Sequence, residues 1–144
     1  MRWSQSKYEM NEHASLSKLV LLIFVLLQSN LLHGAESAPV REIHAKVITP
    51  ASEALYAAET EIPGTDHAWD EIQGIAKELA KAGTTLAAAG TKSGDTAWQK
   101  LTVTLREEAE NAARAAAKHN HEALVAANAK IVAACDACHR DYRK

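Results

Sequence analysis

The C-terminal segment Cys135-Asp136-Ala137-Cys138-His139 holds the side chains of this 144-residue chain that are best suited to chemistry. Two thiols three positions apart lie about one helical turn from each other, and an imidazole follows directly. This C-x-x-C-H spacing is typical of c-type haem attachment, in which the thiols bond two vinyl groups and the imidazole binds the iron from the same side. The motif therefore predicts one covalently attached haem c, with Cys135 and Cys138 as its anchors and His139 as an iron ligand.

Three other uses of two nearby cysteines compete with haem attachment. A disulfide between Cys135 and Cys138 is a common fate of such a pair in an exported protein. A thioredoxin-like redox pair follows a strand, and the sequence predicts no strand there. A zinc site needs four ligands and usually a second Cys/His pair. The helical surroundings and the predicted export favour the haem, with the disulfide as the main alternative.

The elements that must position this motif are helices. Residues 38–144 are rich in alanine, contain three prolines and show no sustained polar and apolar alternation of the kind that a half-buried strand needs. Pro63-Gly64, residues 90–94 and residues 118–121 interrupt the helical pattern. The sequence therefore predicts four helices, at residues 40–60, 66–89, 95–118 and 121–142.

The predicted helices have recognisable starts and apolar faces. Thr65 or Asp66, Asp95 and Asn120 are suited to cap the last three helices. Each segment also carries apolar residues at helical spacing, which defines a shared core. Because connections this short force neighbouring helices to run antiparallel, we expect an all-α fold, an antiparallel up-down-up-down four-helix bundle with C-terminal haem attachment.

Several individual side chains carry further expectations. Pro50 removes a backbone donor within the first predicted helix, which predicts a kink or a break at Thr49. Tyr56 is expected in the core. Trp98 is expected near the end of the bundle that holds the motif, and Tyr142 is expected to cover the edge of the haem or the end of the bundle.

Residues 1–37 have the composition of an export signal. Lys18 precedes an uninterrupted apolar run over residues 19–27, and a stretch of small residues follows. A membrane anchor needs about 20 predominantly apolar residues, but here polar residues follow the short run. We expect a signal peptide that is cleaved after Ser37, and a periplasmic mature domain over residues 38–144 with no membrane segment. A neighbouring cleavage position or a later start codon leaves this domain unchanged.

The charge balance argues against nucleic acid as a partner. Sixteen Lys and Arg against 18 Asp and Glu give a formal net charge of −2, and no basic run concentrates positive charge. The sequence also shows no Ser/His/Asp arrangement, phosphate-binding glycine loop or isolated carboxylate pair that would suggest catalysis. We therefore expect a protein that is not an enzyme and does not bind nucleic acid.

The helical pattern and the C-terminal motif together resemble a known family. The stretch from Cys135 to Arg143, at the end of a four-helix bundle, is similar to that of the class II c-type cytochromes, the cytochrome c-prime superfamily, and the resemblance covers residues 38–144. It implies thioether bonds at Cys135 and Cys138, and His139 as the proximal iron ligand. It also implies that Arg143 is a basic residue beside the proximal face, although a solvated charge near a helix end explains Arg143 equally well. Redox partner proteins and homodimers packed through the first two helices are further implications.

A second likeness to this family lies in the segment Glu42–Ala51. Low-spin members place a methionine ligand there, a few residues before a proline, whereas this chain has His44 at that position. The methionines of the chain, Met1 and Met10, both lie in the predicted leader. Because histidine is itself a good iron ligand, the haem is expected to be bis-histidine ligated, or five-coordinate with His44 nearby as a polar group.

The expected topology separates His44 from the other histidines. In an up-down-up-down bundle the start of the first helix and the end of the last lie together, which places His44 close to His139. A helix of about 20 residues is about 30 Å long, so histidines at the far end cannot reach this iron. We therefore expect His44 as the distal ligand, with a hydrogen-bonded boundary histidine as the alternative. Exposed loop or cap positions are expected for His67, His119 and His121.

These expectations leave three functions. The first is an exported monohaem c-type cytochrome that carries single electrons, with two histidines on the iron. The second is a five-coordinate cytochrome c-prime-like protein that binds diatomic gases such as NO and CO. The third is a haem-free exported helical bundle that binds a partner and carries a disulfide in the C-x-x-C motif. A sixth position closed by His44 favours electron carriage.

Overall fold

The computed structural model describes residues 38–90 and 94–143, and the regular secondary structure of this part of the chain is all helical. The predicted all-α fold is confirmed, and the predicted helix boundaries agree with the observed ones to within two residues. The predicted signal peptide lies outside the described residues. The elements are α2 (Ala38–Ile43), the π-helical turn η1 (His44–Ile48), α3 (Thr49–Thr60), α4 (Asp66–Ala88), α5 (Thr96–Ala116) and α6 (His121–Tyr142).

Each of the last three helices begins at a side-chain cap. The Thr65 hydroxyl, the Asp95 carboxylate and the Asn120 amide oxygen each accept a hydrogen bond from the backbone N–H three residues on, at 3.2, 3.0 and 3.0 Å. These bonds satisfy donors that have no partner within the first helical turn. The predicted caps at Asp95 and Asn120 are confirmed, and of the two candidates before α4 the cap is Thr65.

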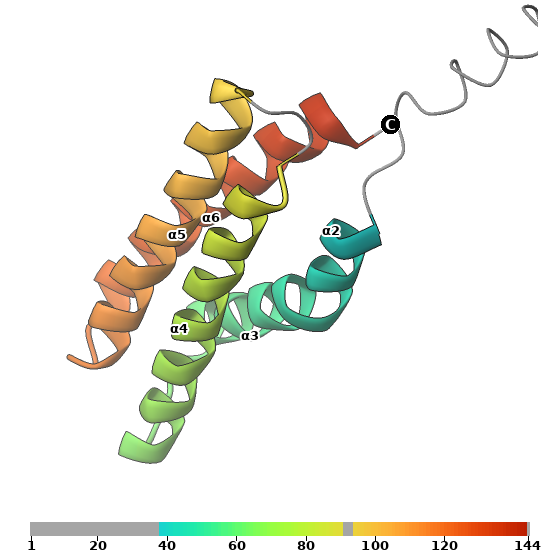
Figure 1. Ribbon diagram of the computed structural model, residues 1–144. Helices are drawn as coiled ribbons and strands as arrows, with labels where there is room; N and C mark the ends of the chain where they lie inside the picture. Colours follow the sequence, from blue (N-terminus) through green and yellow to red (C-terminus); the bar gives the residue numbers. More distant parts are fainter. Residues whose placement is uncertain (1–37, 91–93, 144) are drawn as a thin grey trace, which may run out of the picture. The chain divides into compact units, whose positions relative to one another are not determined.

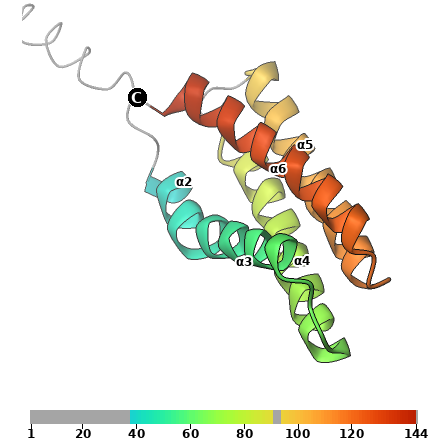
Figure 2. The ribbon, with the colours of Figure 1, turned by 180° about the vertical axis from the view of Figure 1, so that it is seen from behind.

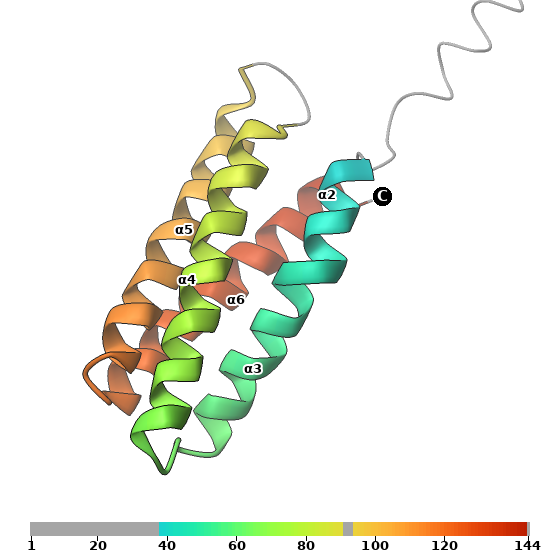
Figure 3. The same ribbon diagram turned by 60° about the horizontal axis from the view of Figure 1, so that its bottom comes forward.

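The helices pack along their apolar faces into a bundle. Figures 1 and 2 show α4 and α5 side by side, with α6 packed along α5. Figure 3 shows that α2, η1 and α3 form one continuous rod, which packs on α4 and α6. Leu55 of α3, Leu79 of α4, and Leu124 and Ile131 of α6 are fully buried and form the centre of the core. Trp69 is also buried, as its place on the apolar stripe of α4 suggests.

Tyr56 is not a core residue, and the expectation that placed it there is wrong. Its side chain is 64% exposed, whereas the preceding Leu55 is fully buried. Consecutive residues of an α-helix point about 100° apart, so the inward direction of Leu55 turns Tyr56 toward the surface.

The first helix is not broken at Thr49. It continues from α2 into α3, and the irregularity that Pro50 imposes takes the form of the π-helical turn η1 just before it. Within this turn the Thr49 N–H donates to the carbonyl of His44, five residues back, where an α-helix would use the carbonyl of Ala45.

The close approach of α4 and α5 yields a stability prediction. A Cβ added at Gly83 would lie 3.0 Å from the backbone N and 3.1 Å from the Cα of Arg106, whereas one added at Gly74 meets nothing within 4 Å. Gly83→Ala is expected to lower the free energy of unfolding by roughly 1–3 kcal/mol, because α5 must shift. Gly74→Ala, the matched control in the same helix, should raise it by roughly 0.5–1 kcal/mol. Chemical denaturation measures both, and equal effects would contradict the packing described.

Candidate functional site

The Cys135–His139 motif occupies the last turns of α6 and faces a small apolar pocket. The pocket has a volume of about 20 Å³ and lies where η1, α4, α5 and α6 meet. Its walls are His44 and Ile48 from η1, Leu86 from α4, Leu101, Thr102 and Leu105 from α5, and Ala134, Cys135, Cys138 and His139 from α6. The structure therefore brings both cysteines and two histidines of distant segments to one pocket.

The imidazoles of His44 and His139 lie against each other in this pocket. Their ring centroids are 5.5 Å apart and the ring planes are inclined by 40°. Both side chains are half-buried, and the two residues come from opposite ends of the described chain. The expectation that His44 lies at the same end of the fold as His139 is thus confirmed.

The two thiols of the motif are half-buried. Burial, and then the nearby negative charge of Asp136, raise the pKa of the Cys135 thiol. The thiol form is therefore favoured at neutral pH, and Cys135 lacks the lowered pKa that marks a catalytic thiolate. This environment suits an anchor more than a nucleophile.

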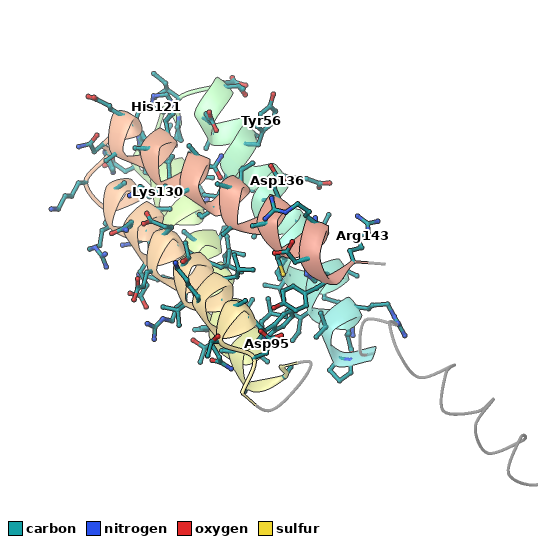
Figure 4. The ribbon with its side chains drawn as sticks, turned by 90° about the horizontal axis from the view of Figure 1, so that it is seen from above. Tyr56, Asp95, His121, Lys130, Asp136 and Arg143 are labelled. Atoms are coloured by element: carbon teal, nitrogen blue, oxygen red, sulfur yellow. The ribbon has the colours of Figure 1, made fainter. Side chains whose placement is uncertain are left out.

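A hydrogen-bonded aromatic cluster holds the C-terminal turn of α6 in place. The Tyr142 hydroxyl lies 2.9 and 3.0 Å from the two carboxylate oxygens of Asp95, to which it donates. The Tyr142 ring meets that of Trp98 edge to face, with centroids 5.1 Å apart, and the Trp98 indole N–H donates to the carbonyl of Leu86 at 2.9 Å. Asp95 lies beside the end of α6 in Figure 4. The cluster thus ties the turn that carries His139 to the start of α5 and the end of α4.

This cluster gives Asp95 and Tyr142 roles beyond those expected from the sequence. Asp95 caps α5 and also accepts from Tyr142. Burial, followed by the hydrogen bond to Asp95, raises the pKa of Tyr142, so its hydroxyl stays protonated and remains a donor well into the alkaline range. The expected position of Trp98 near the motif is confirmed, and Tyr142 packs on Trp98 at that end of the bundle.

Arg143 is exposed at the C-terminal end of α6 (Figure 4). Its backbone N–H donates to the carbonyl of His139 at 3.0 Å, which completes the last helical turn. The Arg143 side chain does not line the pocket. A role of this guanidinium beside an iron centre stays a prediction.

His67, His119 and His121 lie away from the C-terminal motif. The His119 ring stacks on Trp69 with centroids 5.3 Å apart, and exposed His67 lies 3.4 Å from Glu71. Figure 4 shows His121 at the opposite end of α6 from Arg143. His121 differs from the exposed cap expected for it, because its half-buried Nε2 donates to the carbonyls at the end of α3, at 3.1 and 3.0 Å.

A larger depression lies between α3 and α4. This α3–α4 groove has a volume of about 1060 Å³ and an apolar floor of alanine, isoleucine and proline side chains. Lys46, Glu61, Glu71 and Glu78 are the charged residues along it. No cysteine or histidine lines this groove.

Comparison of the chain with protein-family models, with curated proteins and with solved structures finds no significant match. Within residues 38–90 and 94–143, no helix is both long and apolar enough to cross a bilayer. The same residues contain no group of three or more His, Cys, Asp or Glu side chains arranged to hold a bare metal ion.

The pocket residues fit a c-type haem in chemistry and in spacing. Two imidazoles on opposite sides of one iron, each with a metal–nitrogen bond of about 2 Å, have ring centroids roughly 6 Å apart. The 5.5 Å between His44 and His139 is close to that distance, and the two thiols adjoin them on α6. The pocket volume of about 20 Å³ is far smaller than a macrocycle, so its apolar walls would have to open around a haem. The side chains that would hold a haem thus lie together, whereas the cavity for the macrocycle is not preformed.

Proposed function

We propose that residues 38–144 form an exported monohaem c-type cytochrome that carries single electrons. In this proposal the chain is an antiparallel up-down-up-down bundle, Cys135 and Cys138 hold the haem through thioether bonds, and His139 and His44 are the iron ligands. One observation carries the proposal: the paired rings of His44 and His139, 5.5 Å apart, in the pocket that both cysteines line.

The haem supplies reversible one-electron chemistry at its iron when it is bound. The protein holds and orients it. The C-x-x-C-H turn anchors the group to α6, and the bonds among Tyr142, Asp95 and Trp98 fix this turn against α4 and α5. Ile48, Leu86 and Leu105 give the pocket apolar walls, which exclude water from the redox centre.

The position of His44 favours electron carriage over gas binding. A second protein imidazole closes the sixth position of the iron, whereas a gas-binding protein needs that position open or easily opened. In the structure the His44 and His139 ring centroids lie 5.5 Å apart, and Val40 and Ile48, four residues before and after His44, are buried. Binding of NO or CO at a five-coordinate iron remains the alternative function.

The remaining parts of the proposal concern location and partners. The leader composition supports export to the periplasm, where redox partner proteins would exchange the electron. The α3–α4 groove supports a homodimer. Lys46 lies toward one end of the groove and Glu61 toward the other, so a two-fold axis that sets two α3 helices antiparallel brings Lys46 near the partner subunit's Glu61.

Absorption spectra of the purified mature protein test the proposed function. We expect a haem c spectrum that is low-spin in the oxidised and reduced states, and a reduced protein that binds carbon monoxide only weakly. A high-spin iron that binds carbon monoxide would favour the gas-binding alternative. The lack of any haem absorption from a host that matures c-type cytochromes would favour the haem-free bundle.

A further inference from the structure

The π-helical turn η1 lies directly beside the proposed iron site. It begins at His44, and its diagnostic hydrogen bond runs from the Thr49 N–H to the carbonyl of His44. Such a turn holds one residue more than a turn of α-helix and is rare, found mostly as single insertions within α-helices. His44 thus occupies the place, one turn before Thr49, that Ala45 would occupy in a regular α-helix.

Pro50 is the local cause of this insertion. In a regular α-helix its nitrogen would have to donate to the carbonyl of Lys46, but proline has no N–H and its ring presses on that carbonyl. The wider π-helical turn moves the preceding backbone away from the ring, and the helix then resumes as α3. Pro50 is itself exposed, so packing against the core does not explain its presence.

The inserted residue keeps the apolar side chains before and after the turn on the buried side of the helix. Ile48 and Leu55 are buried after the start of the turn, and Val40 is buried before it, at 1% exposure. Without the insertion every residue before Thr49 would move by one position, which is a rotation of about 100° and a rise of about 1.5 Å. Arg41 would then take the place of Val40, and exposed Ala45 would take the place of His44 against His139.

We infer that Pro50 is a positioning residue for the distal iron ligand: by imposing the π-helical turn, it turns His44 toward His139. This inference rests on the proposed function, because it assigns the sixth ligand of the same iron to a backbone insertion. Pro50 acts through the register of the helix and touches neither the iron nor His139. The π-helical turn thus places a ligand at the iron by making one turn of the helix irregular.

The test combines a substitution with a compensating deletion. Pro50→Ala allows the α-helical register, although burial of Val40 opposes the shift, so the sixth position opens in a fraction of the molecules. We expect the apparent affinity of the reduced protein for carbon monoxide to rise about tenfold, because that affinity scales with the open fraction. The double variant that combines Pro50→Ala with deletion of Ala45 lacks the inserted residue, so His44 again lies toward His139. Its affinity for carbon monoxide should return to within about threefold of the wild-type value.

A purely structural role for Pro50 would not give this rescue. Pro63→Ala, in the loop after α3, is the matched control and should leave the spectrum and the carbon monoxide affinity unchanged. An unaltered affinity in Pro50→Ala, or a folded double variant in which the deletion fails to restore it, overturns the inference.

The hydrogen-bond register provides a readout that does not depend on the haem. In crystals of the Pro50→Ala variant the Thr49 N–H should bond to the carbonyl of Ala45 in a fraction of the molecules; a bond to His44 in all of them overturns the inference. Wild-type protein that is high-spin contradicts the proposed ligation and leaves this register test intact. Wild-type protein that is low-spin, with a Pro50→Ala variant that keeps the π-helical turn in all molecules, contradicts the positioning role alone.

Discussion

Intact mass spectrometry of the mature chain, produced in a host that attaches haem to C-x-x-C-H motifs, is expected to give the mass of the polypeptide plus one haem. Cys135 and Cys138 lie one helical turn apart at the pocket that also holds His139, so both thiols can reach one macrocycle from the same helix. Thioether bonds survive denaturation and acid extraction, so the added mass should persist after both treatments. A dissociable haem would be lost.

The control for this expectation is the double substitution Cys135→Ala and Cys138→Ala. Both side chains are half-buried and small, so the helical fold should persist, as far-ultraviolet circular dichroism would report. The covalently added mass should fall from one haem to none. A wild-type mass that lacks the haem and is two hydrogens short would identify a disulfide and reject the cytochrome proposal.

The helices of this chain follow from local features of the sequence. The caps Thr65, Asp95 and Asn120 accept from the backbone N–H three residues away, so the helix starts can be predicted without the tertiary structure. The connections are short enough to fix which helices are neighbours. His44 could be located for the same reason, because the order of the helices decides which ends meet.

Contacts between side chains of helices that are distant in the sequence could not be predicted from local features. Asp95 has the pattern of a cap, and nothing local indicates that Tyr142, 47 positions later, donates to it. His121 likewise resembles a first-turn surface residue, yet its ring reaches the last carbonyls of α3. Each contact depends on the angle at which two helices cross, which periodicity does not specify.

The distortion at Pro50 shows a different limit. The missing N–H predicts that the helix cannot continue regularly, but kinks, breaks and π-helical turns all relieve the same clash. The choice among them depends on the burial of Val40 and Ile48, which fixes the register on both sides of the turn. Secondary-structure reasoning alone places the irregularity and leaves its form open.

Replacement of His44 by alanine is expected to convert a low-spin haem to a high-spin or water-ligated one while the haem stays attached. The ring centroids of His44 and His139 lie 5.5 Å apart, and no methionine is present in residues 38–144 to take the place of the lost imidazole. With its competitor removed, carbon monoxide should bind the reduced iron roughly 10- to 1,000-fold more tightly, the range expected when the open form is a minor population in the wild type.

His121→Ala is the matched control for His44→Ala, because His121 is also half-buried but bonds the end of α3. Its loss should lower the free energy of unfolding by about 1 kcal/mol and leave the spectrum unchanged. The comparison separates a lost ligand from a lost structural contact, because only loss of a ligand changes the spin state. An unchanged spectrum in His44→Ala would falsify ligation by His44. If the unchanged spectrum is high-spin, the sixth position is open, and reversible binding of NO or CO becomes the better account of the site.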